Sequence, residues 1–146
     1  MSTVASILKN KGKNVYSVTP QSTIIDALKL MDEKKIGAVL VMEGDCVQGI
    51  FSERDYARRG VLKGNAESTP VSKVMTDKVY YVKPGQSDET CLAQMSDKHI
   101  RHLPVLEDGK VVGVISIGDV VTSLLKDRDS LIKGLENFIL GEEIKL

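Results

Sequence analysis

The chain of 146 residues has no tryptophan, only 4% aromatic residues, two cysteines and no long apolar run. Few aromatic side chains leave little surface on which single-stranded bases can stack. Because 20 basic residues balance 20 acidic ones, no overall positive field attracts nucleic acid or anionic lipid. The two cysteines, Cys46 and Cys91, form no C-x-x-C pair, so zinc and dithiol sites lack their usual basis.

These absences narrow the class of protein. We interpret both cysteines as small buried apolar residues. No segment has the length of a signal peptide or a membrane span. The sequence therefore predicts a soluble cytoplasmic protein whose partners are small molecules or proteins, with neither nucleic acid nor membrane among them.

An internal repeat organises most of the chain. Residues 15–55 align with residues 79–119 without a gap, at a constant offset of 64. The identical positions are apolar or belong to a cluster of turn and cap residues: Val15, Tyr16, Val18, Pro20, Leu28, Met31, Lys34, Ile36, Val41, Glu43, Val47, Gly49, Ser52 and Asp55. A duplication explains this pattern.

Both copies show the same order of local signals. In the first copy these are a short extended segment at residues 15–18, a helix capped by Ser22 or Thr23, two strands at residues 37–42 and 47–51, and a helix from Glu53. The second copy has strands at residues 103–106 and 111–115 and a helix from Gly118. We predict an α+β fold of two β-α-β-β-α repeats packed sheet to sheet about a pseudo-two-fold axis, with N- and C-terminal helices.

The predicted domain organisation has four parts. They are a first repeat over residues 3–62, a connector over 63–75, a second repeat over 76–125 and a C-terminal helix over 126–146. The C-terminal segment carries apolar residues at helical spacing: Leu131, Ile132, Leu135, Phe138 and Ile139. Such a stripe needs a partner surface.

The last hairpin strand of each copy ends in the pattern G-x-x-S-x-x-D. We call Gly49–Asp55 the first aspartate end and Gly113–Asp119 the second aspartate end. A strand that turns into a helix leaves backbone N–H groups free to bind an anion such as phosphate. The aspartate can accept hydrogen bonds from the two hydroxyls of a ribose, so the pattern predicts a nucleotide site.

The same pattern is also a capping box, in which the serine caps the helix and the acid binds the serine N–H. The matching duplication and the nearby basic residues favour nucleotide binding. Arg54 and Arg58 follow the first serine, and Arg101 and His102 precede a strand of the second copy. For Arg58, and for Arg59 and Lys63, a solvated surface charge is an equally good interpretation.

Other chemistry finds no support in the sequence. His102 has no serine or cysteine partner in a nucleophile motif, and the acidic residues show no metal-ligand spacing. We therefore predict no catalysis, no metal and no catalytic cofactor. Pro104, at a strand start, indicates an edge position or the wall of a pocket.

The chain resembles the CBS-pair family, also called the Bateman module, over about residues 3–125. The resemblance rests on the ungapped duplication, the two aspartate ends, the Val74-Met75-Thr76 entry to the second copy and the segment from Ile100 to Val105. It implies a regulatory, signal-transduction role, a disc-like homodimer and an unidentified target protein regulated in trans. The implied ligand is AMP, ADP, ATP, NAD(H) or S-adenosylmethionine.

The resemblance also implies that each aspartate end faces the strand-entry segment of the other copy. One cleft would then contain Ser52, Arg54, Asp55, Arg58, Thr76, Arg101, His102 and Pro104, and the other Gly37, Ala38, Ser116 and Asp119. We expect the first cleft to prefer a phosphate-rich nucleotide. The second cleft, with few cations, would be weak or selective for adenosine. The alternative is a ligand-independent dimeric interaction module whose aspartate ends only cap helices.

Overall fold

The computed structural model describes residues 2–139 and divides them into two compact units. The first-repeat unit comprises residues 14–81 with 109–112. The second-repeat unit comprises the described parts of residues 1–13, 82–108 and 113–146. Within residues 2–139, no helix combines the length and the apolar character needed to cross a membrane.

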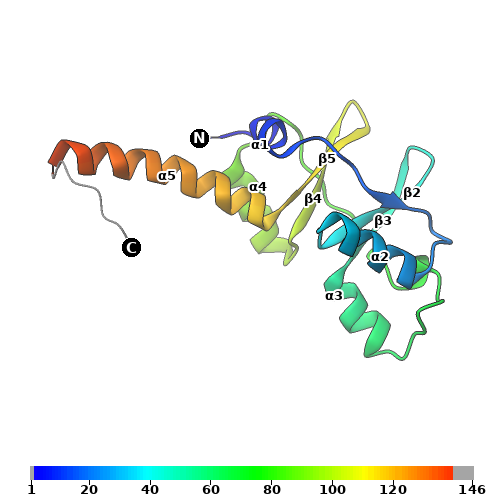
Figure 1. Cartoon of the computed structure of the whole chain (residues 1–146). Coiled ribbons are helices and arrows are strands. Elements are labelled where there is room, and N and C mark those ends of the chain that lie inside the picture. The colour runs from blue at the N-terminus through cyan, green and yellow to red at the C-terminus, as the bar shows by residue number, and fades with distance from the viewer. Residues whose placement is uncertain (1, 140–146) are drawn as a thin grey trace. The chain divides into compact units, whose positions relative to one another are not determined.

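A three-stranded sheet forms the centre of the first-repeat unit, with the strand order β1-β2-β3 (Figure 1). Strand β1 (Ser17–Val18) runs parallel to β2 (Ala38–Glu43), which pairs antiparallel with β3 (Cys46–Ser52). Gly44, with a φ of 62°, makes the predicted tight turn between β2 and β3. Cys46 is exposed at the start of β3, so the prediction that both cysteines are buried was wrong for this one.

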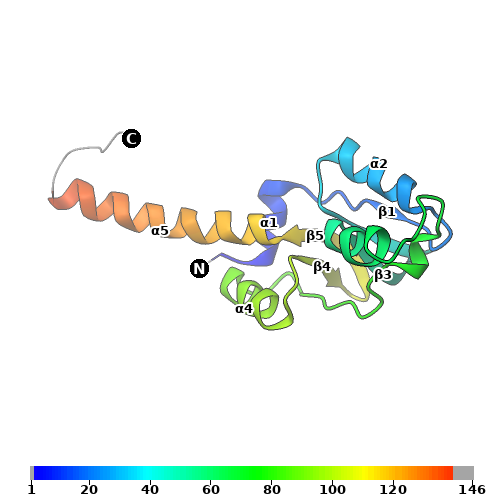
Figure 2. The same cartoon turned by 90° about the horizontal axis from the view of Figure 1, so that it is seen from below.

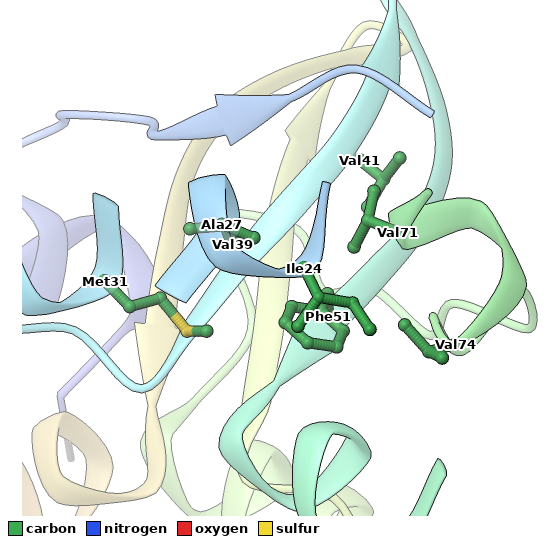
Figure 3. Packing of buried hydrophobic residues seen from close by; sticks show 8 residues of the cluster. All are labelled: Ile24, Ala27, Met31, Val39, Val41, Phe51, Val71 and Val74. Atoms are coloured by element: carbon green, nitrogen blue, oxygen red, sulfur yellow. The ribbon is translucent and has the colours of Figure 1, made fainter. Parts of the chain in front are cut away.

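Helix α2 (Ile24–Lys34) covers the sheet, and the structure shows which of the two predicted residues caps its N-terminus. Thr23 is the cap, because its hydroxyl accepts the N–H of Asp26, whereas Ser22 bonds Thr19 in the preceding turn. The apolar side of α2 packs on the sheet in a buried cluster (Figure 3): Ile24, Ala27, Met31, Val39, Val41, Phe51, Val71 and Val74.

The predicted connector contributes to this core. Its short helix η2 (Val71–Lys73) places Val71 at the cluster, and Val74 follows directly after it; neither side chain is exposed to solvent. The segment is therefore an integral part of the first-repeat unit.

The helix that follows β3 begins at Glu53, as predicted, but it changes its geometry after one turn. Helix α3 (Glu53–Asp55) continues as the π-helix η1 (Tyr56–Val61), in which the N–H of Leu62 binds the carbonyl of Ala57. Gly60 is buried here, and a Cβ on it would lie 2.9 Å from the Tyr56 ring. Wide turns of this kind often occur next to functional residues.

The second-repeat unit has the same plan. Strands β4 (His102–Glu107) and β5 (Lys110–Ser116) form a hairpin, and Val82 adds a parallel bridge to Val105, as Val18 does to Val41 in the other repeat. Helix α4 (Asp88–Lys98) lies beside helix α5 (Ile117–Ile139) in both views (Figures 1 and 2). Helix α5 is continuous from the second aspartate end through the segment that the sequence separated at residue 126.

The N-terminal helix α1 (Val4–Lys11) belongs to the second-repeat unit. The N–H of Val4 binds the carbonyl of Gln86, and a Cβ on Gly113 would lie 2.6 Å from a Leu8 methyl. In the other unit, Val71 binds Ser22 in the same way, and Met75 packs on Gly49. Residues 3–13, which the sequence analysis assigned to the first repeat, thus make their contacts in the second-repeat unit, and the predicted bounds of the repeats stay a prediction.

The described structure confirms the α+β fold with two repeats of strands and helices. The packing of the two sheets about a pseudo-two-fold axis stays a prediction. The side chains of Leu131, Phe138 and Ile139, and residues 140–146, lie outside the described part of the chain.

Replacement of Phe51 by alanine should lower the free energy of unfolding by about 3–5 kcal/mol, because the ring is fully buried in the first-repeat core. Urea denaturation measures the loss. The control is Leu62→Ala, because this side chain is 76% exposed and its removal should cost less than about 0.5 kcal/mol. Equal losses from the two variants would contradict the described core.

Candidate functional site

The first aspartate end forms a complete capping box. The N–H of Ser52 donates to Asp55 Oδ2 at 3.0 Å, the Ser52 hydroxyl donates to the same oxygen at 3.1 Å, and the N–H of Asp55 donates to the Ser52 hydroxyl at 3.2 Å. The interpretation of this end as a helix cap is therefore correct. These bonds also hold the carboxylate in one orientation at the helix start, where it is half-buried.

Thr76, which the family resemblance implied to lie in the same cleft as Asp55, completes this end. Its backbone forms two hydrogen bonds of 2.9 Å with Ile50, and its hydroxyl donates to Asp55 Oδ1 at 3.0 Å. The close approach depends on Gly49, since a Cβ there would lie 2.8 Å from the Thr76 carbonyl oxygen. Both oxygens of Asp55 are thus fixed by protein donors.

The basic residues of this end have different positions. Arg54 lies on α3 next to Asp55, and Arg58 is exposed on η1. Arg59, for which the sequence analysis left a surface charge and a ligand role open, binds the Met75 carbonyl at 2.7 Å and fastens the π-helix to the connector. Its role in the described structure is to anchor that helix.

Each strand-entry segment lies beside the aspartate end of its own repeat. The carbonyl of Gly37, just before Ala38, accepts the N–H of Glu53 at 3.1 Å. The carbonyl of Arg101 accepts the N–H of Ile117 at 2.8 Å in the same way. The implied pairing of Asp55 with Arg101 and His102 across the repeats stays a prediction.

The second aspartate end keeps the capping box but has a different partner for its carboxylate. The N–H of Ser116 donates to Asp119 Oδ2 at 2.8 Å, and the N–H of Asp119 donates to the Ser116 hydroxyl at 3.2 Å. Lys11 Nζ lies 2.6 Å from Asp119 Oδ2 and 2.8 Å from the Val114 carbonyl oxygen. Among the described residues, every hydrogen bond to this carboxylate ends on Oδ2.

Burial alone would raise the pKa of Asp119, but the hydrogen bonds from Lys11 and Ser116 together with the charge of Lys11 outweigh it and lower the pKa. The carboxylate is therefore ionised at neutral pH. The sequence analysis expected few cations at this end and did not foresee Lys11, which α1 brings to Asp119.

His102 and Pro104 lie on β4 in the same unit. The pKa of His102 is lowered to about 4, first by burial and then by Lys11 and Arg101, with Asp119 acting in the opposite direction. The imidazole is therefore neutral at pH 7. Pro104 is buried inside the strand, and its carbonyl accepts the N–H of Val82, so the strand is covered on that side.

Groups that could carry other chemistry do not assemble a reactive site in the described part of the chain. Burial, followed by the charge of Asp88, raises the pKa of Cys91 to about 11, so this thiol stays protonated. Asp88 itself is fully buried and accepts the Ser123 hydroxyl at 2.8 Å, which ties α4 to α5. No three His, Cys, Asp or Glu residues among residues 2–139 lie close enough to hold a metal ion.

Lys11 is the residue that the sequence analysis missed. Val4-Ala5-Ser6-Ile7-Leu8 has the apolar pattern of Val71-Ser72-Lys73-Val74-Met75, which indicates that the two segments pack alike but does not identify Lys11, because the match aligns Thr76 with Lys9. This match runs at an offset of 67, three residues more than the repeat itself, so an ungapped alignment at 64 does not contain it.

The fold and the two capped aspartates define a tandem-repeat protein with two equivalent α+β units. A model of the CBS domain matches residues 4–61 and 71–126, and the chain belongs to the CBS-domain family. It is a tandem CBS-domain pair, similar to free-standing proteins of this kind. Free-standing CBS-domain proteins are typically non-catalytic regulatory modules.

Two relatives illustrate the similarity in sequence. The chain is 33% identical to the mitochondrial CBS domain-containing protein CBSX3 of Arabidopsis thaliana, over 95% of this chain and 72% of that protein. It is 29% identical to the CBS domain-containing protein YhcV of Bacillus subtilis, over 87% of this chain and 91% of that protein.

Solved structures of CBS-domain proteins are also similar to this chain. A CBS-domain protein from Burkholderia ambifaria, provisionally assigned to signal transduction, is 50% identical, with a TM-score of 0.83 over 86% of this chain and 96% of that one. The CBS-domain pair of protein MJ0100, solved with 5′-methylthioadenosine and S-adenosyl-L-methionine, has a TM-score of 0.74 at 22% identity, over 88% of this chain and 98% of that one, and shows the shared fold.

The lowered pKa of His102 predicts a specific pH dependence. The unfolded chain binds a proton at this residue below about pH 6.5, whereas the folded chain does so only near pH 4, so folding is destabilised as the pH falls through this window. Between pH 7 and pH 5, the wild type should lose about 1–2 kcal/mol more stability than His102→Gln. Urea denaturation at the two pH values measures the difference.

An NMR titration of the His102 ring supplies the control for this prediction. The midpoint should rise in Lys11→Met, because a positive charge that disfavours the imidazolium is removed. A wild-type midpoint near 6.5 would contradict the described surroundings of the ring.

Proposed function

We propose that the protein is a regulatory CBS-pair module that senses adenine nucleotides, has no catalysis of its own and regulates a partner protein in trans. The observation that carries this proposal is the repeated carboxylate, held in the same capping box at the start of a helix in both repeats. Helix capping requires neither the same aspartate twice nor a second partner on each carboxylate. The second partners, Thr76 at Asp55 and Lys11 at Asp119, help to preorient each carboxylate as an acceptor, and this supports a ligand site.

The chemistry fits a nucleoside with vicinal hydroxyls. An ionised carboxylate accepts hydrogen bonds from a ribose diol, and arginine binds phosphate through charge-assisted hydrogen bonds. The proposed ligands are AMP, ADP, ATP or NAD(H). The MJ0100 domain pair, solved with two adenosyl ligands, supports the choice of ligand class for the fold. The proposed binding residues are those that the sequence nominated, with Asp55 and Asp119 as the ribose acceptors.

Regulation follows from a difference in affinity. A ligand that binds one arrangement of the repeats more tightly shifts the population toward it, by no more than that difference in binding free energy. A partner protein that reads the surface of the favoured arrangement then responds. A cytoplasmic location, expected from the sequence, is retained as part of the proposal.

One observation favours a second candidate function. The aspartates already satisfy their capping partners inside the protein, which is what a ligand-independent interaction module would need. In that case the aspartate ends would contribute to stability alone.

Nucleotide binding is tested by thermal unfolding with AMP, ATP, NADH or S-adenosylmethionine. A ligand at about 100 times its Kd should raise the Tm by about 5–10 °C. Asp55→Asn should lose at least half of this shift, because a ribose acceptor is removed. The matched control is Asp26→Asn at the same position of α2, where Thr23 caps the helix. No shift with any of the four ligands would favour the interaction module.

We also propose a homodimer. Helix α5 exposes a line of apolar side chains, namely Ile117, Val121, Leu125, Ile132 and Leu135. Their intervals of three, four and seven residues keep them on one side of the helix, which is the pattern of a packing face. CBS-domain relatives form oligomers, and a cyanobacterial CBS-CP12 protein is hexameric.

Light scattering tests the homodimer. The wild type should have the mass of a dimer, and Ile132→Glu should shift it toward the monomer, because a charge then lies within the proposed interface. Lys133→Glu, on the neighbouring position and outside the apolar line, should leave the dimer intact. A monomeric wild type, with and without nucleotide, would contradict the proposal.

A further inference from the structure

The two aspartate ends differ in the group that meets the carboxylate. In the first, the partner is the neutral hydroxyl of Thr76, 3.0 Å from Asp55 Oδ1. In the second, it is the ammonium group of Lys11, 2.6 Å from Asp119 Oδ2. Both partners come from the segment that packs on the glycine of the last hairpin strand. The difference between the two ends is therefore local: a neutral donor in the first end is replaced by a cation in the second.

Two hydrogen bonds fix the position of the Lys11 ammonium group. It donates to both Asp119 and the Val114 carbonyl, which leaves one of its three N–H bonds for another acceptor. The side chain is 34% exposed and that of Asp119 is 24% exposed, so a ligand can reach the pair. The hydrogen bonds to Asp119 from described residues use only Oδ2, which leaves Oδ1 as an acceptor.

A pocket of about 350 Å³ opens beside this pair, between α1 and α5. The volume lies at the lower end of the range for small-molecule sites. Lys11 and Lys126 line the pocket together with Asp119 and Asp127, and Ser2 donates its hydroxyl to Asp127. The other lining residues include side-chain hydroxyls and an amide, which can form hydrogen bonds with a polar ligand, and the apolar side chain of Ile7.

The charged residues that line the pocket determine which kind of polar ligand can bind there. The two lysines balance the two aspartates of the pocket, whereas without Lys11 the pocket would carry a net negative charge and repel an anion. Arg101 adds a further positive potential at the neighbouring His102. The remaining Lys11 N–H and Asp119 Oδ1 then offer a cationic donor and an acceptor side by side.

We propose that Lys11 determines the ligand preference of the second aspartate end, by pairing with Asp119 so that this end holds a phosphate-bearing ligand, with the phosphate near Lys11 and a hydroxyl group on Asp119. The proposal rests on the proposed nucleotide-sensing function. It differs from the expectation that this end has few cations and is weak or selective for adenosine.

The experiment compares AMP with adenosine by calorimetry in an Asp55→Asn background, which weakens the first end. Adding Lys11→Met should weaken AMP binding about tenfold, since a charged hydrogen bond is lost and the Asp119 charge is exposed to the phosphate. Adenosine binding should change less than about twofold. Lys11→Arg, which keeps the cation, should retain AMP binding to within about threefold.

The matched control is Lys9→Met, an exposed lysine on the same helix that does not line the pocket. It should leave both ligands unaffected, and the Tm of each variant without ligand shows that the fold is kept. Equal weakening of AMP and adenosine by Lys11→Met would assign Lys11 a structural role and overturn the proposal, as would unchanged or tighter AMP binding.

Failure of this proposal can be told apart from failure of the proposed function. If the wild type binds AMP and the Asp55→Asn background binds neither ligand, the protein senses nucleotides but the second end does not hold one, and the Lys11 proposal falls alone. If the wild type binds none of the adenine ligands, the proposed function itself falls.

Discussion

In each unit, a segment from outside the hairpin packs directly on the glycine of the last hairpin strand. Met75 and Thr76 approach Gly49, and Leu8 approaches Gly113, at distances that leave no room for a Cβ. This close contact fixes where the segment leaves the strand and therefore which side chain reaches the aspartate six residues after that glycine. Thr76 at Asp55 and Lys11 at Asp119 both depend on it.

The aspartates combine a structural and a chemical role without conflict. A carboxylate has two oxygens with about four acceptor positions, and a capping box uses only part of this capacity. Asp119 shows the consequence most clearly, because its described bonds all end on one oxygen. A capped helix and an available ribose acceptor are therefore compatible, and the presence of a capping box does not decide between a structural and a binding role.

The duplication has produced equivalent scaffolds with different electrostatics. The same strand and helix plan is repeated, but Arg59 and Thr76 in one repeat have no like residues in the other, where Ser123 and Lys11 take their places at the helix and at the carboxylate. His102 is affected by this difference as well, because Lys11 contributes to the lowered pKa that keeps its imidazole neutral. Binding preferences in such a pair depend on a few side chains around a shared backbone frame.

The sequence by itself determined the repeat, the order of strands and helices and the two aspartate ends. These features follow from local patterns: apolar periodicity, turn residues and caps act between near neighbours, and a duplication makes each signal appear twice. Only the tertiary structure decided that α1 belongs with the second repeat, that η1 is a π-helix and that Lys11 pairs with Asp119. The position of α1 and of Lys11 depends on packing between segments more than 100 residues apart, which leaves no period in the sequence. The π-helix is fastened to the connector by Arg59, whose side chain binds the Met75 carbonyl.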